Sequence, residues 1–218
     1  SRDMYPLSPV ADIVVFISTL LVSLVLHEMM HAAVAYKLGD DLAHSEGRIS
    51  LNPLNHIDPF LTIIMPLLFY VTTGAFILAA KPVPINTSRI RGDEYGLALV
   101  GIAGPLTNFA LAILGGVLLR FISLGGVVEA VLLQFIVINV ALCAFNLLPI
   151  PPLDGSRVLY AVAPDAVRAV MQRIEHFGLM LLLLLIFALG PVIYPILSGL
   201  NLALLTVVDA VSNGRIPL

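Results

Sequence analysis

The residues of this sequence best suited to chemistry are two histidines and a glutamate in the stretch His27-Glu28-Met29-Met30-His31. On an α-helix, side chains four positions apart share one face, so the two imidazoles could bind one metal ion together. Glu28 lies about 100° around the helix from His27, where it could take a proton from water beside such an ion. A zinc ion would lower the pKa of that water to about 7. The pattern therefore predicts a hydrolytic zinc site.

The surroundings of this motif strengthen that interpretation. The motif lies inside the apolar run LLVSLVLHEMMHAAVAYKL, residues 20–38. An ionisable side chain costs free energy within a bilayer, so it indicates a function by default when it occurs in a spanning helix. Chance could produce the pattern in a soluble helix, but three ionisable residues among five apolar-flanked positions favour a functional site.

The composition indicates a membrane protein. Hydrophobic residues make up 59% of the 218 residues and charged residues 11%, whereas soluble domains have about 25% charged residues. Apolar runs long enough to span a bilayer cover residues 10–38, 61–80, 97–122, 127–148 and 177–197. A shorter run, 200–211, could be a partial span or an interfacial helix. We expect an all-α polytopic membrane protein of about five to six transmembrane or re-entrant helices, with short membrane-associated β-strands or a hairpin.

The same features predict how many domains the chain has and which classes of partner it binds. Residues 1–218 are expected to form a single membrane-embedded domain, with its catalytic core over about 10–165 and C-terminal helices over about 175–211. The net charge is −3 and the sequence has no basic block, which argues against nucleic acid as a partner. The lipid bilayer and membrane-embedded peptides or proteins are the expected partners. The single cysteine, Cys143, lies in an apolar run and is expected to be a packing residue.

A catalytic zinc ion usually has three protein ligands and one open position. Asp154 is the candidate for the third ligand, because it follows an apolar helix directly in the stretch LLPIPPLDGS. Irregular backbone persists at membrane depth only where protein buries it or where it lines a watery cavity. The other interpretation is an ordinary Asp-Gly turn at a helix end. The need for a third ligand favours Asp154, since none of His44, His56 and His176 is clearly placed for that role.

Three motifs, taken in order, make the chain resemble the site-2 protease family. They are HEMMH at 27–31, GPLTN at 104–108 and NLLPIPPLDG at 146–155. The stretches GRISLNPLNHIDP and KPVPIN are similar to those of compact members that lack an appended PDZ or CBS domain. The resemblance, over about residues 20–160, implies an intramembrane zinc metalloprotease with one zinc ion. It implies His27, His31 and Asp154 as ligands, Glu28 as general base, and Asn146 in substrate binding or oxyanion stabilisation.

Other polar positions have two interpretations each. The amide of Asn146 could stabilise a developing oxyanion or cap the broken helix end. An extended segment could pair with a substrate backbone as an edge strand, or it could be a purely structural hairpin. That segment comprises Lys81, Pro82, Val83, Pro84, Ile85 and Asn86. Another short strand is possible at 48–51. Asn108, in GPLTN, is expected to bridge packed helices.

Two other functions compete with proteolysis: a membrane zinc transporter and a zinc-binding scaffold. A transporter would favour several polar helices lining a path across both leaflets. Polar residues instead concentrate around one site, and residues 177–197 are almost entirely apolar. A scaffold has no need of Glu28. The sequence therefore favours the protease.

The membrane topology follows from the depth that the ligands must share. The helices at 10–38 and 127–148 must run in the same direction, so an odd number of full spans separates them. Residues 97–122 form one clean span, so residues 61–80, interrupted by Pro66 and Gly74, are expected to enter and return on one side. By the positive-inside rule, the N-terminus is then extracytoplasmic and the zinc site lies nearer the cytoplasm, in the cell membrane. The basic residues placed on the cytoplasmic side are Lys37, Arg48, Lys81, Arg89, Arg91, Arg157, Arg168 and Arg173.

Overall fold

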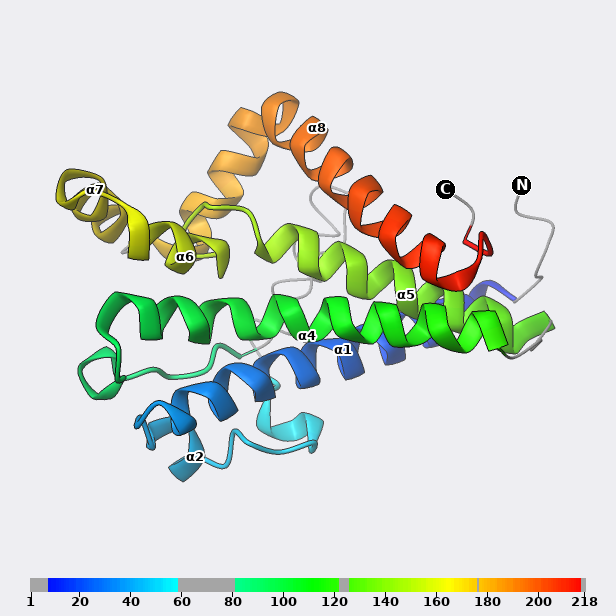
Figure 1. The fold of residues 1–218 in the computed structure, drawn as a ribbon, viewed down its shortest axis with the longest axis horizontal. Helices are drawn as coiled ribbons and strands as arrows, with labels where there is room; N and C mark the ends of the chain where they lie inside the picture. Colours follow the sequence, from blue (N-terminus) through cyan, green and yellow to red (C-terminus); the bar gives the residue numbers. More distant parts are fainter. Residues whose placement is uncertain (1–7, 59–80, 122–125, 176, 217–218) are drawn as a thin grey trace.

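The computed structural model describes residues 8–58, 81–121, 126–175 and 177–216 (Figure 1). Four long helices dominate this part of the chain: α1 (Pro9–Lys37), α4 (Asp93–Phe121), α5 (Gly126–Asn146) and α8 (Gly178–Ser212). Short elements connect them: α2 (Leu42–Ser45), η1 (Pro53–Asn55), η3 (Thr87–Arg89), α6 (Gly155–Val162) and α7 (Asp165–Glu175).

Four segments of these helices are long and apolar enough to cross a membrane. They are Val10–Lys37, Asp93–Phe121, Gly126–Asn146 and Gly190–Ser212. Their length and composition confirm the prediction of a helical, polytopic membrane protein. The predicted re-entrant segment, 61–80, lies outside the described residues.

Helix α4 is the central element of the bundle. It packs against α1, α5, α6 and α8. Figure 1 shows that α4 runs opposite to both α1 and α5, so α1 and α5 run in the same direction. That is the arrangement which ligands at a shared depth require. Buried apolar side chains fix α4 to α5 and α8, among them Ala112, Ile136 and Val208.

Helix α8 corrects one predicted boundary. The sequence suggested two segments separated between residues 197 and 200, but α8 continues through this region as one helix. Pro191 and Pro195 lie inside it, and Figure 1 shows the helix bent. A proline removes one helical hydrogen bond and kinks the helix without ending it when the flanking turns remain apolar and bonded.

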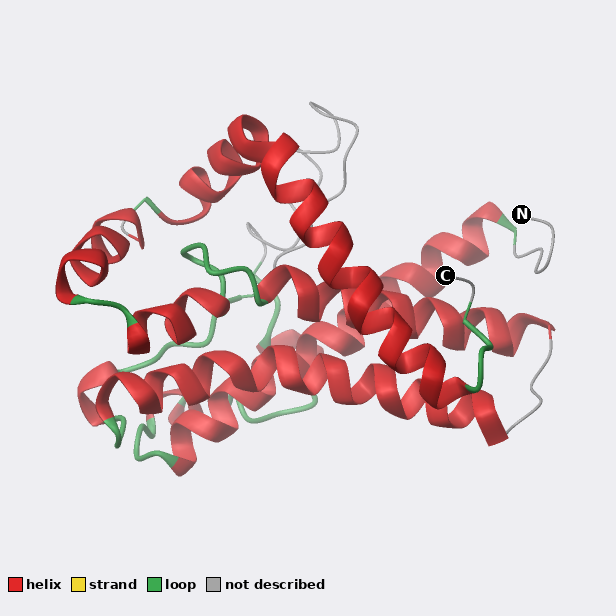
Figure 2. Cartoon of the chain, turned by 45° about the horizontal axis from the view of Figure 1, so that its top comes forward, coloured by secondary structure: helices red, strands yellow, loops and turns green. Residues whose placement is uncertain are grey.

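The predicted β-strands are wrong. Figure 2 shows helices and loops but no strand among the described residues, so 48–51 and 81–86 are both irregular. The side chain of Arg48, 1% exposed, donates hydrogen bonds to the main-chain oxygens of Asn55, Lys81 and Pro82. These main-chain oxygens accept hydrogen bonds from a guanidinium and not from the N–H groups of a neighbouring strand. Pro82 and Pro84 also have no N–H to contribute to a strand ladder.

Candidate metal centre

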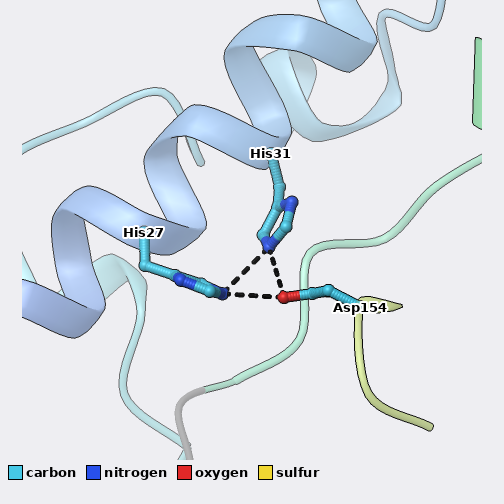
Figure 3. A group of neighbouring side chains, drawn as sticks. All are labelled: His27, His31 and Asp154. Carbon is cyan, nitrogen blue, oxygen red and sulfur yellow. Dashed lines mark hydrogen bonds and ion pairs between the residues drawn. The ribbon is translucent and has the colours of Figure 1, made fainter. Parts of the chain in front are cut away.

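The candidate metal centre lies between α1 and the turn that precedes α6. His27 and His31 project from one face of α1, and they are 3% and 5% exposed. Their Nε2 atoms are 3.0 Å apart. Asp154 points its carboxylate at the same place, with Oδ2 3.0 Å from His27 Nε2 and 3.2 Å from His31 Nε2 (Figure 3). The predicted spacing of the motif on a helix is thus confirmed, and the structure brings Asp154 to it.

These separations fit a zinc ion. Ligand atoms about 2.0–2.1 Å from a tetrahedral zinc ion lie roughly 3.3 Å from one another. The three atoms observed here form a triangle with sides of 3.0–3.2 Å, which suits three ligands of one such ion. Two imidazoles and one carboxylate are also a donor set that zinc accepts in hydrolytic sites.

Helix α4 orients both imidazoles from behind. His31 Nδ1 donates a hydrogen bond to the main-chain oxygen of Val100 at 2.7 Å, and His27 Nδ1 lies 2.6 Å from Oδ1 of Asn108. A carbonyl oxygen only accepts, so each Nδ1 carries a proton, and Nε2 is the nitrogen of each ring that can bind a metal ion. Hydrogen bonds of this kind fix the ring orientation of metal-binding histidines.

Gly104 lies between these two contacts on the same face of α4. A β-carbon at this position would lie 2.4 Å from His31 Nε2 and 2.5 Å from His27 Nε2. Only glycine lets the helix approach the imidazoles this closely. GPLTN therefore supports helix packing, as predicted, but it also forms the back wall of the centre, which the sequence analysis missed. The signal was its spacing: Gly104 and Asn108 are four residues apart, like His27 and His31 on the antiparallel partner.

Asp154 is held by the turn between α5 and α6. Leu148 and Leu153 are buried together beside it, and Ser156 donates a hydrogen bond through Oγ to the main-chain oxygen of Leu153 at 2.6 Å. Burial raises the pKa of Asp154, but hydrogen bonds and charge from His27 and His31 outweigh it and hold the pKa below its ordinary value. The carboxyl is therefore ionised at neutral pH, as a cation ligand must be.

The other predicted site residues lie nearby in the chain but make different contacts. Glu28 follows His27 on α1 and is partly buried. Asn146 is the last residue of α5, and its Nδ2 donates to the main-chain oxygen of Leu142 at 3.0 Å. This bond runs back to the preceding turn of the same helix. His44 stacks on Tyr36 at the surface, and buried His56 bonds the oxygen of Ser50, so neither joins the centre.

A cavity of 460 Å³ lies beside the predicted substrate segment 81–86. Val83, Ile85 and Thr87 line one wall, which is the alternation expected of an extended chain. Ser156 and Arg157, which follow Asp154 closely in the sequence, line another. His27, Glu28, His31 and Asp154 are not among the residues that line the cavity. Charged side chains at its rim include Asp93, Glu94 and Glu175.

Comparison with known proteins agrees with this chemistry. Residues 122–189 match the sequence profile described as Peptidase family M50. YwhC of Bacillus subtilis, named as a candidate zinc metalloprotease, is 38% identical over 206 residues, covering 89% of this chain and 90% of the relative. Rip2 of Mycobacterium tuberculosis, named likewise, is 33% identical and covers 86% of this chain and 72% of the relative. A similarly named protein of Methanocaldococcus jannaschii is 36% identical, over 69% of this chain and 73% of its own length. No solved structure matches the chain.

Proposed function

This chain belongs to peptidase family M50, the site-2 proteases, and is a zinc metalloprotease of membranes, and we propose that it hydrolyses peptide bonds in or near the transmembrane segments of other membrane-bound proteins. One observation carries the proposal. His27 and His31 are buried on Val10–Lys37, a helix long and apolar enough to cross a bilayer. A reacting peptide bond must therefore reach a site built among spanning helices, which favours membrane-embedded substrates.

We assign the reaction to four side chains. His27, His31 and Asp154 would hold one zinc ion, which supplies a Lewis acid that lowers the pKa of water to about 7. Glu28 would accept the proton from the attacking water and pass it to the leaving amine nitrogen. An amide nitrogen carries two hydrogens, so Asn146 can keep its bond to Leu142 and offer the other N–H to the developing oxyanion.

The segment 81–86 is suited to hold the substrate in an extended form. It is fixed at both ends, because the N–H of Lys81 donates to His56 at 2.9 Å and the N–H of Asn86 donates to Asp40 at 2.7 Å. Between these ends, no described residue hydrogen-bonds to the main-chain groups of Val83 and Ile85. These groups could pair with a substrate backbone and unwind a helix, which exposes its peptide bonds to hydrolysis.

The test is cleavage of a quenched fluorescent peptide that carries one apolar span, measured in liposomes that contain the purified protein and zinc. We expect cleavage by the wild type, loss of cleavage with a chelator, and no cleavage by Glu28→Gln although that variant keeps its zinc. Cleavage by Glu28→Gln at the wild-type rate would overturn the mechanism. Equal cleavage of an unstructured soluble peptide would overturn the preference for membrane substrates.

A further inference from the structure

Asn139 is a fully buried amide in the middle of α5, with an exposed fraction of 0%. A buried polar group costs free energy unless its hydrogen bonds are satisfied, and the cost applies within a spanning helix too. Its Nδ2 donates to Ser23 Oγ at 2.9 Å and to the main-chain oxygen of Phe135 at 2.9 Å. Its Oδ1 accepts from Nδ2 of Asn108 at 2.9 Å. Asn139 therefore connects α1, α4 and α5 behind the metal centre.

The partners of Asn139 permit only one orientation of its amide. The oxygen of Phe135 is a main-chain carbonyl and can only accept. Ser23 Oγ donates its own hydrogen to the main-chain oxygen of Thr19 at 2.7 Å, so it can only accept from Asn139. Both hydrogens of Asn139 Nδ2 are used in this way, and Oδ1 must face Asn108.

That constraint passes through Asn108 to the metal centre. Asn108 must present Nδ2 to Asn139, and the same nitrogen also lies 3.3 Å from the main-chain oxygen of Ser23. Its Oδ1 then faces His27 and accepts the hydrogen on Nδ1 at 2.6 Å. With a proton fixed on Nδ1, Nε2 is the nitrogen of His27 that can bind a metal ion, and it faces His31 and Asp154.

We propose that Asn139 is a positioning residue for the zinc centre, which acts through Asn108 to fix the tautomer of His27 that leaves Nε2 free for the metal. The proposal rests on the proposed role of His27 as a zinc ligand. This series of hydrogen bonds ends at main-chain carbonyls of α1 and α5, which can only accept a hydrogen bond, so the direction of each bond in the series is fixed. Without Asn139, only the longer bond of Asn108 Nδ2 to the oxygen of Ser23, at 3.3 Å, opposes a turn of the Asn108 amide. That turn would bring the Asn108 nitrogen toward His27 and favour the proton on Nε2, where it opposes zinc.

The test compares zinc affinity in four variants. Asn139→Leu removes the amide at similar volume, and we expect the dissociation constant for zinc to rise about 10–100-fold. Asn108→Leu should raise it at least as much, and the double variant should be no worse than Asn108→Leu alone, because the two residues act in series. Asn201→Leu, a matched change in α8, should leave the constant unchanged. Multiplying effects in the double variant would overturn the proposal.

A second measurement separates positioning from simple helix packing. ¹⁵N spectra of the zinc-free protein with labelled histidines should show a proton on Nδ1 of His27, whose signal is assigned with His27→Ala. In Asn139→Leu, part of the population should lack the proton on Nδ1. Where Asn139→Leu does not fold, Asn139→Ala takes its place. A lower stability with an unchanged His27 spectrum and zinc affinity would leave Asn139 as packing only. Retention of zinc by His27→Ala would instead disprove the ligand assignment.

Discussion

Gly104 packs directly against His31, so closely that a β-carbon on Gly104 would lie 2.4 Å from His31 Nε2. Real β-carbons do not approach a neighbouring atom to this distance. One of the two groups would have to move, and the atom in question is the one that faces the metal position. The distance between α1 and α4 is therefore set by a glycine, and the geometry of the zinc centre depends on it.

Gly104→Ala should weaken zinc binding and impair cleavage while leaving the helix content unchanged. The methyl group would displace both imidazole rings from positions where their Nε2 atoms can share an ion, so we expect zinc affinity to fall by about 10-fold or more. Zinc content by mass spectrometry and helicity by circular dichroism would measure this. Gly199→Ala is the control, because a β-carbon there meets nothing within 4 Å. A Gly104→Ala protein with full zinc would show that α4 does not constrain the ligands.

Removal of a ligand should have a different effect from removal of a carboxylate that is not a ligand. We expect wild-type protein to hold about one zinc ion per chain, and His31→Ala and Asp154→Ala each to lose it together with activity. Asp165 lies exposed at the start of α7, and Asp165→Ala should retain both. Zinc bound in full by the Asp154→Ala protein would remove Asp154 from the ligand set.

The residues of the centre that could be predicted most directly from the sequence are those that lie close together in it. His27 and His31 lie one helical turn apart, so the pattern alone places their side chains together. Asp154 required a further argument, the need for a third ligand, because its approach depends on how α5 ends and α6 begins. The direction of α1 relative to α5 followed from that same argument.

The features that sequence reasoning missed depend on contacts between distant elements. Asn108 and Asn139 carry a signal in their polarity within apolar helices, but their hydrogen bonds to His27 and Ser23 become visible only once three helices are packed. The predicted strand at 48–51 failed for a similar reason. The propensity of a short segment cannot reveal that the guanidinium of Arg48 will occupy carbonyls over thirty positions away in the chain.

Val83→Pro should impair cleavage without loss of zinc. Proline keeps the backbone extended but removes the N–H that we assign to pairing with the substrate. We expect the KM for the spanning peptide to rise about 10-fold, a loss comparable with that of a good hydrogen bond. Val83→Ala keeps the N–H and shortens the side chain, so it should bind the peptide more tightly than Val83→Pro does. Equal kinetics for the two variants would argue against backbone pairing at this residue.

The prediction that residues 38–58 and 81–91 lie on one side of the membrane is supported by contacts between these two segments. The N–H of Arg91 donates to the oxygen of Leu38 at 2.8 Å, and Arg89 forms an ion pair with Asp41. The end of α1 and the start of α4 therefore lie at one end of the molecule, together with α6 and α7 (Figure 1). Arg120 lies at the opposite end of α4, where Arg215 bonds the main-chain oxygen of Leu119.

Cysteine-accessibility labelling should place Ser45 and Ser88 on the same side of the membrane, and that side should be the cytoplasm. Both side chains are exposed, and the segments that carry them contact each other directly. Most basic residues of the chain lie on elements at this end, and the positive-inside rule assigns such an end to the cytoplasm.

Single cysteines at 45 and 88, in a Cys143→Ala background, would be treated in intact cells with a membrane-impermeant maleimide. We expect both to be protected until the cells are permeabilised, whereas a cysteine at Asn213, beyond the end of α8, should react at once. Reaction of Ser45→Cys and Ser88→Cys from opposite sides would show that residues 61–80 cross the bilayer fully.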